Sequence, residues 1–252
     1  MGNNNILITF GCSWTFGVGA TYMTGMSLEQ FERYAWDEYY ITKYTFRKLI
    51  SDQLGCEHIN FSYGSSSNQK QFRLAREFFL TKDKRWFENH NVTVLWGLTS
   101  LYRTEYFNTI NNKYDNFLLT VPTEKDWKDL SRILLEKYFN EDVELENLSL
   151  QMKMFDIFFA HKGIKNYWFN TFNPHQYTLD FKNLLFEGHD LLSLLIKDYK
   201  PNDLYHLSDW NDNDRKIKLA KEQGLVNPIS LHPTRKSHKM IANMFLEQLI
   251  KT

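Results

Sequence analysis

Two residues at opposite ends of the sequence have the types needed for nucleophilic catalysis. Ser13 follows a short apolar run and lies in the segment Gly-Cys-Ser-Trp-Thr-Phe-Gly, and His232 lies near the C-terminus in Leu-His-Pro-Thr. A serine hydroxyl is a poor nucleophile until a neighbouring base takes its proton. Histidine suits this task because its ordinary pKa lies near neutrality. If the fold brings the two side chains together, they would support acyl transfer through an acyl-serine.

The elements around these residues predict a sheet that would bring them together. The short apolar runs typical of buried strands are residues 6–10, 58–61, 92–96 and 167–172. The stretches typical of helices are residues 46–54, 68–80, 148–159, 184–196 and 234–250, with a capping box at Ser27-Leu-Glu-Gln30. Strands that alternate with helices pair in parallel, and ligands bind beyond their carboxyl ends. We therefore expect a three-layer α/β/α sandwich with a mainly parallel central sheet.

Four segments rich in small and polar residues follow the predicted strands or precede the last helix. They are residues 11–17, residues 60–68 (Asn-Phe-Ser-Tyr-Gly-Ser-Ser-Ser-Asn), residues 96–100 (Trp-Gly-Leu-Thr-Ser) and residues 231–238 (Leu-His-Pro-Thr-Arg-Lys-Ser-His). In this order they resemble the SGNH (GDSL-like) hydrolase family, whose blocks are Gly-Asp-Ser, a block with a Gly, Gly-x-Asn-Asp, and Asp-x-x-His-Pro. The resemblance covers nearly the whole chain. The opening Phe-Gly-Cys-Ser-Trp-Thr-Phe-Gly and the Trp-Gly third block are most similar to divergent, phage-type members.

The resemblance implies a flavodoxin-like fold and a serine esterase or deacetylase. Such an enzyme removes a small acyl group from a carbohydrate or similar alcohol and needs no cofactor. Ser13 would be the nucleophile and His232 the base. The resemblance assigns the oxyanion hole to the backbone amides of Ser13 and Gly64 and to a third-block side chain at Thr99, with Asn68 as an alternative donor. Among neighbouring residues, Trp14 and Arg103 are candidates for substrate binding.

Three positions depart from the family pattern. Thr99 stands where the family has Asn, Cys12 stands where it has the Asp before the serine, and Ile229 stands where it has the acidic residue that orients the histidine. A backbone carbonyl would then hold His232, or a carboxylate from elsewhere would do so, with candidates at Asp209, Asp212 and Asp214. The remaining alternative is a catalytically degenerate binding or structural protein on the same fold.

The same residues also have purely structural interpretations. Ser13 could cap the helix that follows the strand, and His232 could be an ordinary loop residue before a proline. Thr99 could serve packing alone, and Arg103 could form a surface salt bridge. We interpret Cys12 as a small buried residue, with a cysteine nucleophile as a minor alternative. Three further histidines are expected to pack in the core or lie on the surface: His175, His189 and His238, the last of them against the preceding loop.

Cofactor and metal sites lack their usual patterns. Gly17-x-Gly19 has Tyr22 in place of the third glycine of a dinucleotide-binding loop, and no Gly-Lys-Ser/Thr of a phosphate loop is present. The acidic run Asp212-Asn-Asp214 lacks the glycine and closing glutamate of a calcium loop. No His/Cys spacing indicates zinc.

Composition favours a single domain that works away from nucleic acids and membranes. The 252 residues carry no net charge, so the basic excess of a nucleic-acid binder is missing. No apolar run spans a bilayer, no signal peptide is recognisable, and only two cysteines occur, which together predict a cytoplasmic protein. We expect one domain over residues 1–252 with a polar, aromatic and irregular insertion at about 103–145, which has helical hints from Asp126 to Phe139. The oligomeric state stays open.

Overall fold

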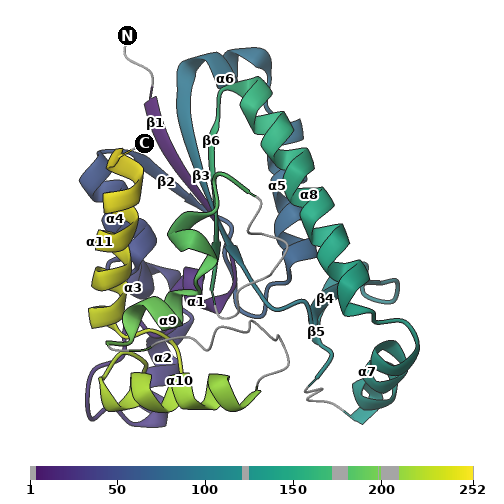
Figure 1. Ribbon diagram of the computed structural model, residues 1–252, viewed down its shortest axis with the longest axis vertical. Helices are drawn as coiled ribbons and strands as arrows, with labels where there is room; N and C mark the ends of the chain where they lie inside the picture. Colours follow the sequence, from purple (N-terminus) through teal and green to yellow (C-terminus); the bar gives the residue numbers. More distant parts are fainter. Residues whose placement is uncertain (1–3, 121–124, 172–180, 198, 200–209, 252) are drawn as a thin grey trace.

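The computed structural model describes residues 4–120, 125–171, 181–197, 199 and 210–251. A four-stranded parallel sheet with the order β2-β1-β3-β6 forms its centre (Figure 1). The strands are β1 (Asn4–Phe10), β2 (Glu57–Asn60), β3 (His90–Leu98) and β6 (Lys165–Asn170). All four lie where the apolar runs predict them.

Side chains of the central strands alternate between two apolar clusters. In β1, Ile6, Ile8 and Phe10 join one cluster, whereas Leu7 joins the other. Because consecutive side chains of a strand point to opposite faces, both faces of this sheet must be covered. Trp96 of β3 is fully buried in the first cluster.

Helices cover both faces, as expected. Residues of α5 (Asn68–Leu80), α6 (Lys84–Asn89) and α8 (Glu141–Lys162) join the first cluster, and residues of α4 (Phe46–Leu54), α9 (Leu191–Leu195) and α11 (Arg235–Lys251) join the second. Figure 1 shows α5 and α8 on one side of the sheet and α4 and α11 on the other. The fold is thus a three-layer α/β/α sandwich with a parallel central sheet.

Local signals in the sequence fix several helix ends. Helix α2 (Leu28–Ala35) begins with the predicted capping box between Ser27 and Gln30. Helix α4 ends at Gly55, whose φ of 59° is left-handed and therefore favours glycine. Four further elements of the described part are α1 (Ser13–Phe16), α3 (Glu38–Thr42), η2 (Leu185–Gly188) and α10 (Trp210–Glu222).

The described part of the expected insertion contains a hairpin that was not predicted and a helix where helical hints were noted. β4 (Arg103–Asn108) and β5 (Lys113–Leu118) form an antiparallel hairpin, and α7 (Lys125–Lys137) follows. Helix α8 begins at Glu141, near the approximate end expected for the insertion, and places Leu145 in the core. Within the described residues, no helix has both the length and the apolarity to cross a membrane.

Candidate active site

Ser13 and His232 meet at the carboxyl edge of the sheet. The Ser13 Oγ lies 2.7 Å from His232 Nε2, although the residues are 219 positions apart. Ser13 is the first residue of α1, directly after β1, and the helix ends after one turn at Gly17 with φ 102°. His232 lies in the loop before α11. Parallel strands bring loops from distant parts of the chain to one edge, which explains the contact.

The second ring nitrogen of His232 faces oxygens of Ser230. Nδ1 lies 2.7 Å from the Ser230 carbonyl oxygen and 3.1 Å from its Oγ. A carbonyl oxygen only accepts hydrogen bonds, so Nδ1 must carry the proton of the neutral ring. Nε2 then has a free lone pair and accepts the hydrogen bond from Ser13. This tautomer is the one that a general base requires.

The electrostatic surroundings keep His232 neutral. Burial lowers its pKa to about 4, the Ser230 carbonyl opposes this shift, and the positive charge of Arg103 adds to it. At neutral pH the ring is therefore unprotonated and able to take a proton. Among the described residues, the hydrogen-bond partners of the ring nitrogens are neutral oxygens of Ser230 and Ser13.

The chain approaches the His232 loop closely at Gly19. A Cβ at this position would lie 2.2 Å from the Pro233 carbonyl oxygen and 2.8 Å from that of His232. Real Cβ contacts are never so short, so any side chain here would displace the loop. Gly19 therefore has a packing role, although its spacing from Gly17 first suggested a nucleotide loop.

The second block lies next to the serine turn. The Tyr63 amide donates to the Gly11 carbonyl at 3.1 Å, which ties the block to the residues before Ser13. Gly64 is buried, and a Cβ there would lie 2.4 Å from the ring of Trp36. The glycine is thus required by a close contact, whatever its amide does.

Asn68 and Thr99 form one unit after β3. The Asn68 Nδ2 donates to the Thr99 carbonyl, and the Thr99 amide donates to Asn68 Oδ1, both at 2.9 Å. Both residues are buried. Asn68 therefore fixes the backbone of Thr99, a role that the sequence analysis did not anticipate.

The two candidate substrate-binding residues lie in different surroundings. Trp14 is 5% exposed and packs in the second core cluster. Its expected contact with substrate stays a prediction. Arg103 is half-buried at the start of β4 and lines a cavity of about 450 Å³ together with Asn68 and Glu105. Arg73 pairs with Glu105 through two hydrogen bonds of 2.9 Å at this cavity.

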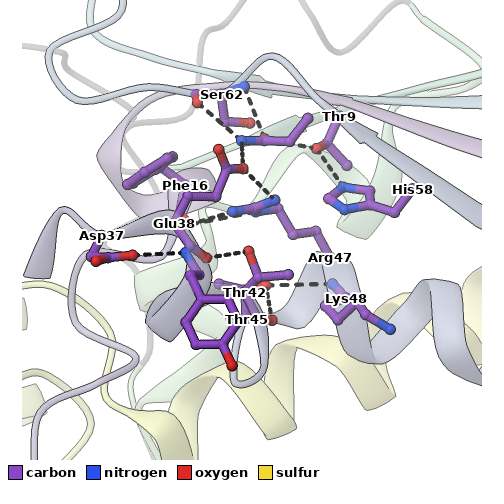
Figure 2. A network of polar contacts seen from close by, with 12 residues as sticks. Thr9, Phe16, Asp37, Glu38, Thr42, Thr45, Arg47, Lys48, His58 and Ser62 are labelled. Carbon is purple, nitrogen blue, oxygen red and sulfur yellow. Dashed lines mark hydrogen bonds and ion pairs between the residues drawn. The ribbon is translucent and has the colours of Figure 1, made fainter. Parts of the chain in front are cut away.

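A buried arginine holds the other end of the serine helix. Arg47 donates to the Phe16 carbonyl from Nη2 at 3.1 Å and from Nε at 3.4 Å, and its Nη1 lies 3.6 Å from Glu38 (Figure 2). Asn60 of β2 also donates to Glu38, at 3.0 Å. Burial lowers the pKa of Arg47 to about 10, with Glu38 opposing the shift. The sequence gives little signal for this role, since Arg47 is one polar residue within an amphipathic helix.

The residues considered as replacements for the family acid do not contact His232 in the described part. Ile229 packs against the apolar cluster of Phe31 and its neighbours. Asp214 is exposed on α10, and Asp209 and the side chain of Asp212 lie outside the described residues. A backbone carbonyl, one of the alternatives left open by the sequence, thus faces the ring.

The remaining histidines named in the sequence analysis lie apart from this contact where the structure describes them. His238 is fully buried and stacks on Phe46, with Nδ1 accepting from the Phe46 amide at 3.3 Å. It therefore lies in the core within the first turn of α11, the turn where we expected it. His189 is half-buried, and His175 lies outside the described residues. In the described part, no three side chains of metal-binding type are grouped.

Known proteins resemble this chain in structure rather than in sequence. No family model matches the sequence, and no curated protein matches it. A carbohydrate esterase described as having divergent catalytic and non-catalytic binding functions aligns with a TM-score of 0.51 at 9% identity. That alignment covers 100% of this chain and 66% of the esterase, so this chain spans slightly less than two thirds of its neighbour.

Two further solved structures align over almost the whole chain. A psychrotrophic esterase from Pseudoalteromonas sp. has a TM-score of 0.47 at 13% identity and covers 99% of this chain and 98% of its own. An acetyl xylan esterase from the rumen bacterium Butyrivibrio proteoclasticus has a TM-score of 0.47 at 9% identity and covers 99% of this chain and 64% of its own. At such identities the similarity concerns the fold alone: this chain shares the α/β fold of the carbohydrate esterase.

Proposed function

We propose that this chain is a serine ester hydrolase that removes a small acyl group from a carbohydrate or similar alcohol. The observation that carries the proposal is the 2.7 Å contact between Ser13 Oγ and His232 Nε2, with Nδ1 of the same ring held by the Ser230 carbonyl. A nucleophile, a base and a group that orients the base are the elements of acyl transfer. The esterase neighbours share the fold that positions them.

In the first half-reaction, His232 Nε2 takes the Ser13 hydroxyl proton while Oγ attacks the ester carbonyl carbon. The carbonyl oxygen becomes an oxyanion, for which we propose the amides of Ser13 and Gly64 and the Thr99 hydroxyl as donors. The second amide hydrogen of Asn68 is the alternative donor. The bond from carbon to the alcohol oxygen then breaks, and Nε2 gives its proton to the leaving alcohol.

In the second half-reaction, water attacks the acyl-serine. His232 Nε2 takes one proton from this water, the oxygen adds to the acyl carbon, and the bond to Ser13 Oγ breaks. The proton returns to Oγ as the free acid leaves. We propose that the half-buried Arg103 and its cavity contact the alcohol part of the substrate, because the cavity is also lined by Asn68, whose side chain binds the Thr99 backbone.

A second candidate function is binding without turnover. It is favoured by the same two departures noted in the sequence: Thr99 in place of an amide side chain, and Ile229 in place of the acid. Removing one oxyanion donor typically slows an enzyme about a hundred- to thousandfold. A chain with both changes would then retain the cleft and lose most of the rate.

Intact mass after exposure to a fluorophosphonate probe separates these functions. We expect one adduct on the wild type and none on Ser13→Ala, because only an activated serine reacts. Ser149→Ala on α8 is the matched control and should be labelled like the wild type. Folded wild-type protein that stays unlabelled would exclude the hydrolase and leave the binding protein.

A further inference from the structure

The loop that carries His232 is organised around one buried side chain, that of Asn227. Asn227 has no exposed surface. Its Oδ1 accepts from the Ile229 amide at 3.1 Å and from the Ser230 amide at 2.7 Å. Its Nδ2 donates to Ser230 Oγ at 2.8 Å and to the His232 carbonyl at 3.2 Å. A single amide thus contacts three of the five residues that follow it.

The backbone between Ser230 and His232 has an unusual conformation. Leu231 has a φ of 59°, the left-handed region that a residue with a side chain rarely adopts. Two backbone hydrogen bonds close the loop at this point, from the Leu231 amide to the Asn227 carbonyl at 3.1 Å and from the Asn227 amide to the His232 carbonyl at 2.9 Å. The bonds of Asn227 compensate for the unfavourable conformation of Leu231, as strained residues at functional sites require.

This reversal of the chain turns the His232 ring back over the residue two positions before it. The ring nitrogen Nδ1 then meets both oxygens of Ser230, the carbonyl and the hydroxyl. The hydroxyl is itself held by Asn227, since it lies 2.8 Å from Nδ2 and 3.0 Å from Oδ1. The contacts therefore form a chain from Asn227 through Ser230 and His232 to Ser13.

We propose that Asn227 and Ser230 are positioning residues that replace the acid of the family: they fix the Nδ1–H tautomer of His232 and aim Nε2 at Ser13. The inference rests on the proposed function for its kinetic consequences, because positioning a base matters only where a proton is transferred. In this arrangement the orienting group is neutral and comes from a turn of the backbone. A carboxylate at position 229 would add little, because Ile229 packs in an apolar cluster.

Hydrolysis of 4-nitrophenyl acetate tests the kinetic part. Ser230→Ala removes the hydroxyl and keeps the carbonyl, so we expect kcat to fall about tenfold or more, as for the loss of one hydrogen bond to a group that becomes charged. Asn227→Ala releases the whole turn, and we expect a loss of about a hundredfold or more, the effect of a misplaced catalytic group. KM should stay within about twofold in both variants, because neither side chain is part of the proposed substrate contacts.

Asn227→Asp distinguishes a positioning role of this side chain from a role in stability alone. The introduced carboxylate keeps the Oδ1 acceptor for the Ile229 and Ser230 amides and loses the Nδ2 donor. We expect it to retain more activity than Asn227→Ala. Its negative charge near Nδ1 should also move the acid limb of the pH profile of kcat/KM upward by about one unit.

Two controls account for general loss of stability. Asn140→Ala removes another asparagine that binds backbone, the cap of α8, whose Oδ1 accepts from Val143 at 3.2 Å. Ser149→Ala removes a half-buried hydroxyl of the same helix. Both should leave kcat and the pH profile unchanged. If Asn140→Ala lowers kcat as much as Asn227→Ala does, the positioning proposal is overturned.

Nitrogen-15 NMR of the imidazole rings tests the tautomer without any substrate. We expect the wild type to show His232 protonated at Nδ1, and Asn227→Ala to show a mixture of tautomers. If the wild type shows the Nδ1–H tautomer but is inactive and forms no fluorophosphonate adduct, the hydrolase proposal is refuted and the positioning role of Asn227 and Ser230 is kept. An Nε2–H tautomer in the wild type, or an unchanged tautomer in Asn227→Ala, would refute the positioning role even in an active enzyme.

Discussion

Lowering the pH from 7 to 5 should destabilise this protein strongly through three histidines. Burial is the main cause that lowers the pKa of His58 to about 3, of His232 to about 4 and of His238 to about 3. Positive charge adds to the shift in each case, from Arg47 at His58 and His238 and from Arg103 at His232. All three rings are thus neutral in the folded protein until the pH falls well below 5.

The sign and size of the change in the free energy of unfolding with pH follow from the number of protons bound by the folded and the unfolded protein. In the unfolded chain these rings take up protons as the pH falls through about 6.5, whereas the folded protein excludes them until about pH 4. Each extra proton lowers the free energy of unfolding by about 1.4 kcal/mol per pH unit. Three histidines therefore give a slope of up to about 4 kcal/mol per unit near pH 5.

Two carboxyl groups partly oppose this effect. Burial raises the pKa values of Glu141 and Glu144, so the folded protein binds their protons before the unfolded chain does. We therefore expect a net slope between about 2 and 4 kcal/mol per pH unit. A typical domain has a free energy of unfolding of about 5–15 kcal/mol, so acid unfolding is expected between about pH 4 and 5.

Urea unfolding followed by tryptophan fluorescence at pH 7, 6, 5.5 and 5 measures this slope. Carbon-13 NMR of the histidine rings checks its cause, because three of the eight rings should stay neutral in the folded protein at pH 5.5. A free energy of unfolding that is constant between pH 6.5 and 5 would refute the reasoning. So would the titration of every ring near pH 6.5.

Three further predictions concern the site itself. Since neutral His232 is the base and its pKa is about 4, kcat/KM for 4-nitrophenyl acetate should stay level from pH 8 to about 5 in folded protein; an acid limb near 6.5 would contradict this. Asn68→Ala removes both hydrogen bonds to the Thr99 backbone, so urea unfolding should show a loss of about 2 kcal/mol, and unchanged stability would count against the unit. In Gly19→Ala the new Cβ collides with the Pro233 carbonyl, and fluorophosphonate labelling should slow about a hundredfold; labelling at the wild-type rate would show that the loop tolerates the displacement.

The sequence predicts those helices and strands whose type and ends depend on the pattern of their own residues. The two middle strands, β1 and β3, contain continuous apolar runs because both of their faces are buried. Helix α5 lies at Asn68–Leu80, the predicted range, because its apolar residues recur at helical spacing. Helix α4 ends at the predicted Gly55 for the local reason of a left-handed φ.

Elements determined by contacts to the rest of the fold were not predictable. Phe117 is the one buried residue in the strands of the β4–β5 hairpin, so these strands show no clear apolar alternation. Helix α10 has a strongly polar sequence, which lacks the periodicity that indicates a helix. The burial of Trp14 was not predictable either, because it depends on the single turn of α1, which places this side chain in the second core cluster.

The candidate site likewise contains residues that the sequence predicts and residues that only the fold brings into contact. Ser13 and His232 were recognisable because their residue types are needed at the point where protons move. Ser230 and Asn227 were not, because the Ser230 carbonyl exists at every position of a chain and becomes an orienting group only through the turn at Leu231. Ile229 at the family's acidic position therefore does not leave the histidine without a partner. The partner of His232 Nδ1 is a backbone carbonyl, that of Ser230, and not a carboxylate side chain. The side chain that we propose to matter is that of Asn227, because it shapes the turn that presents this carbonyl.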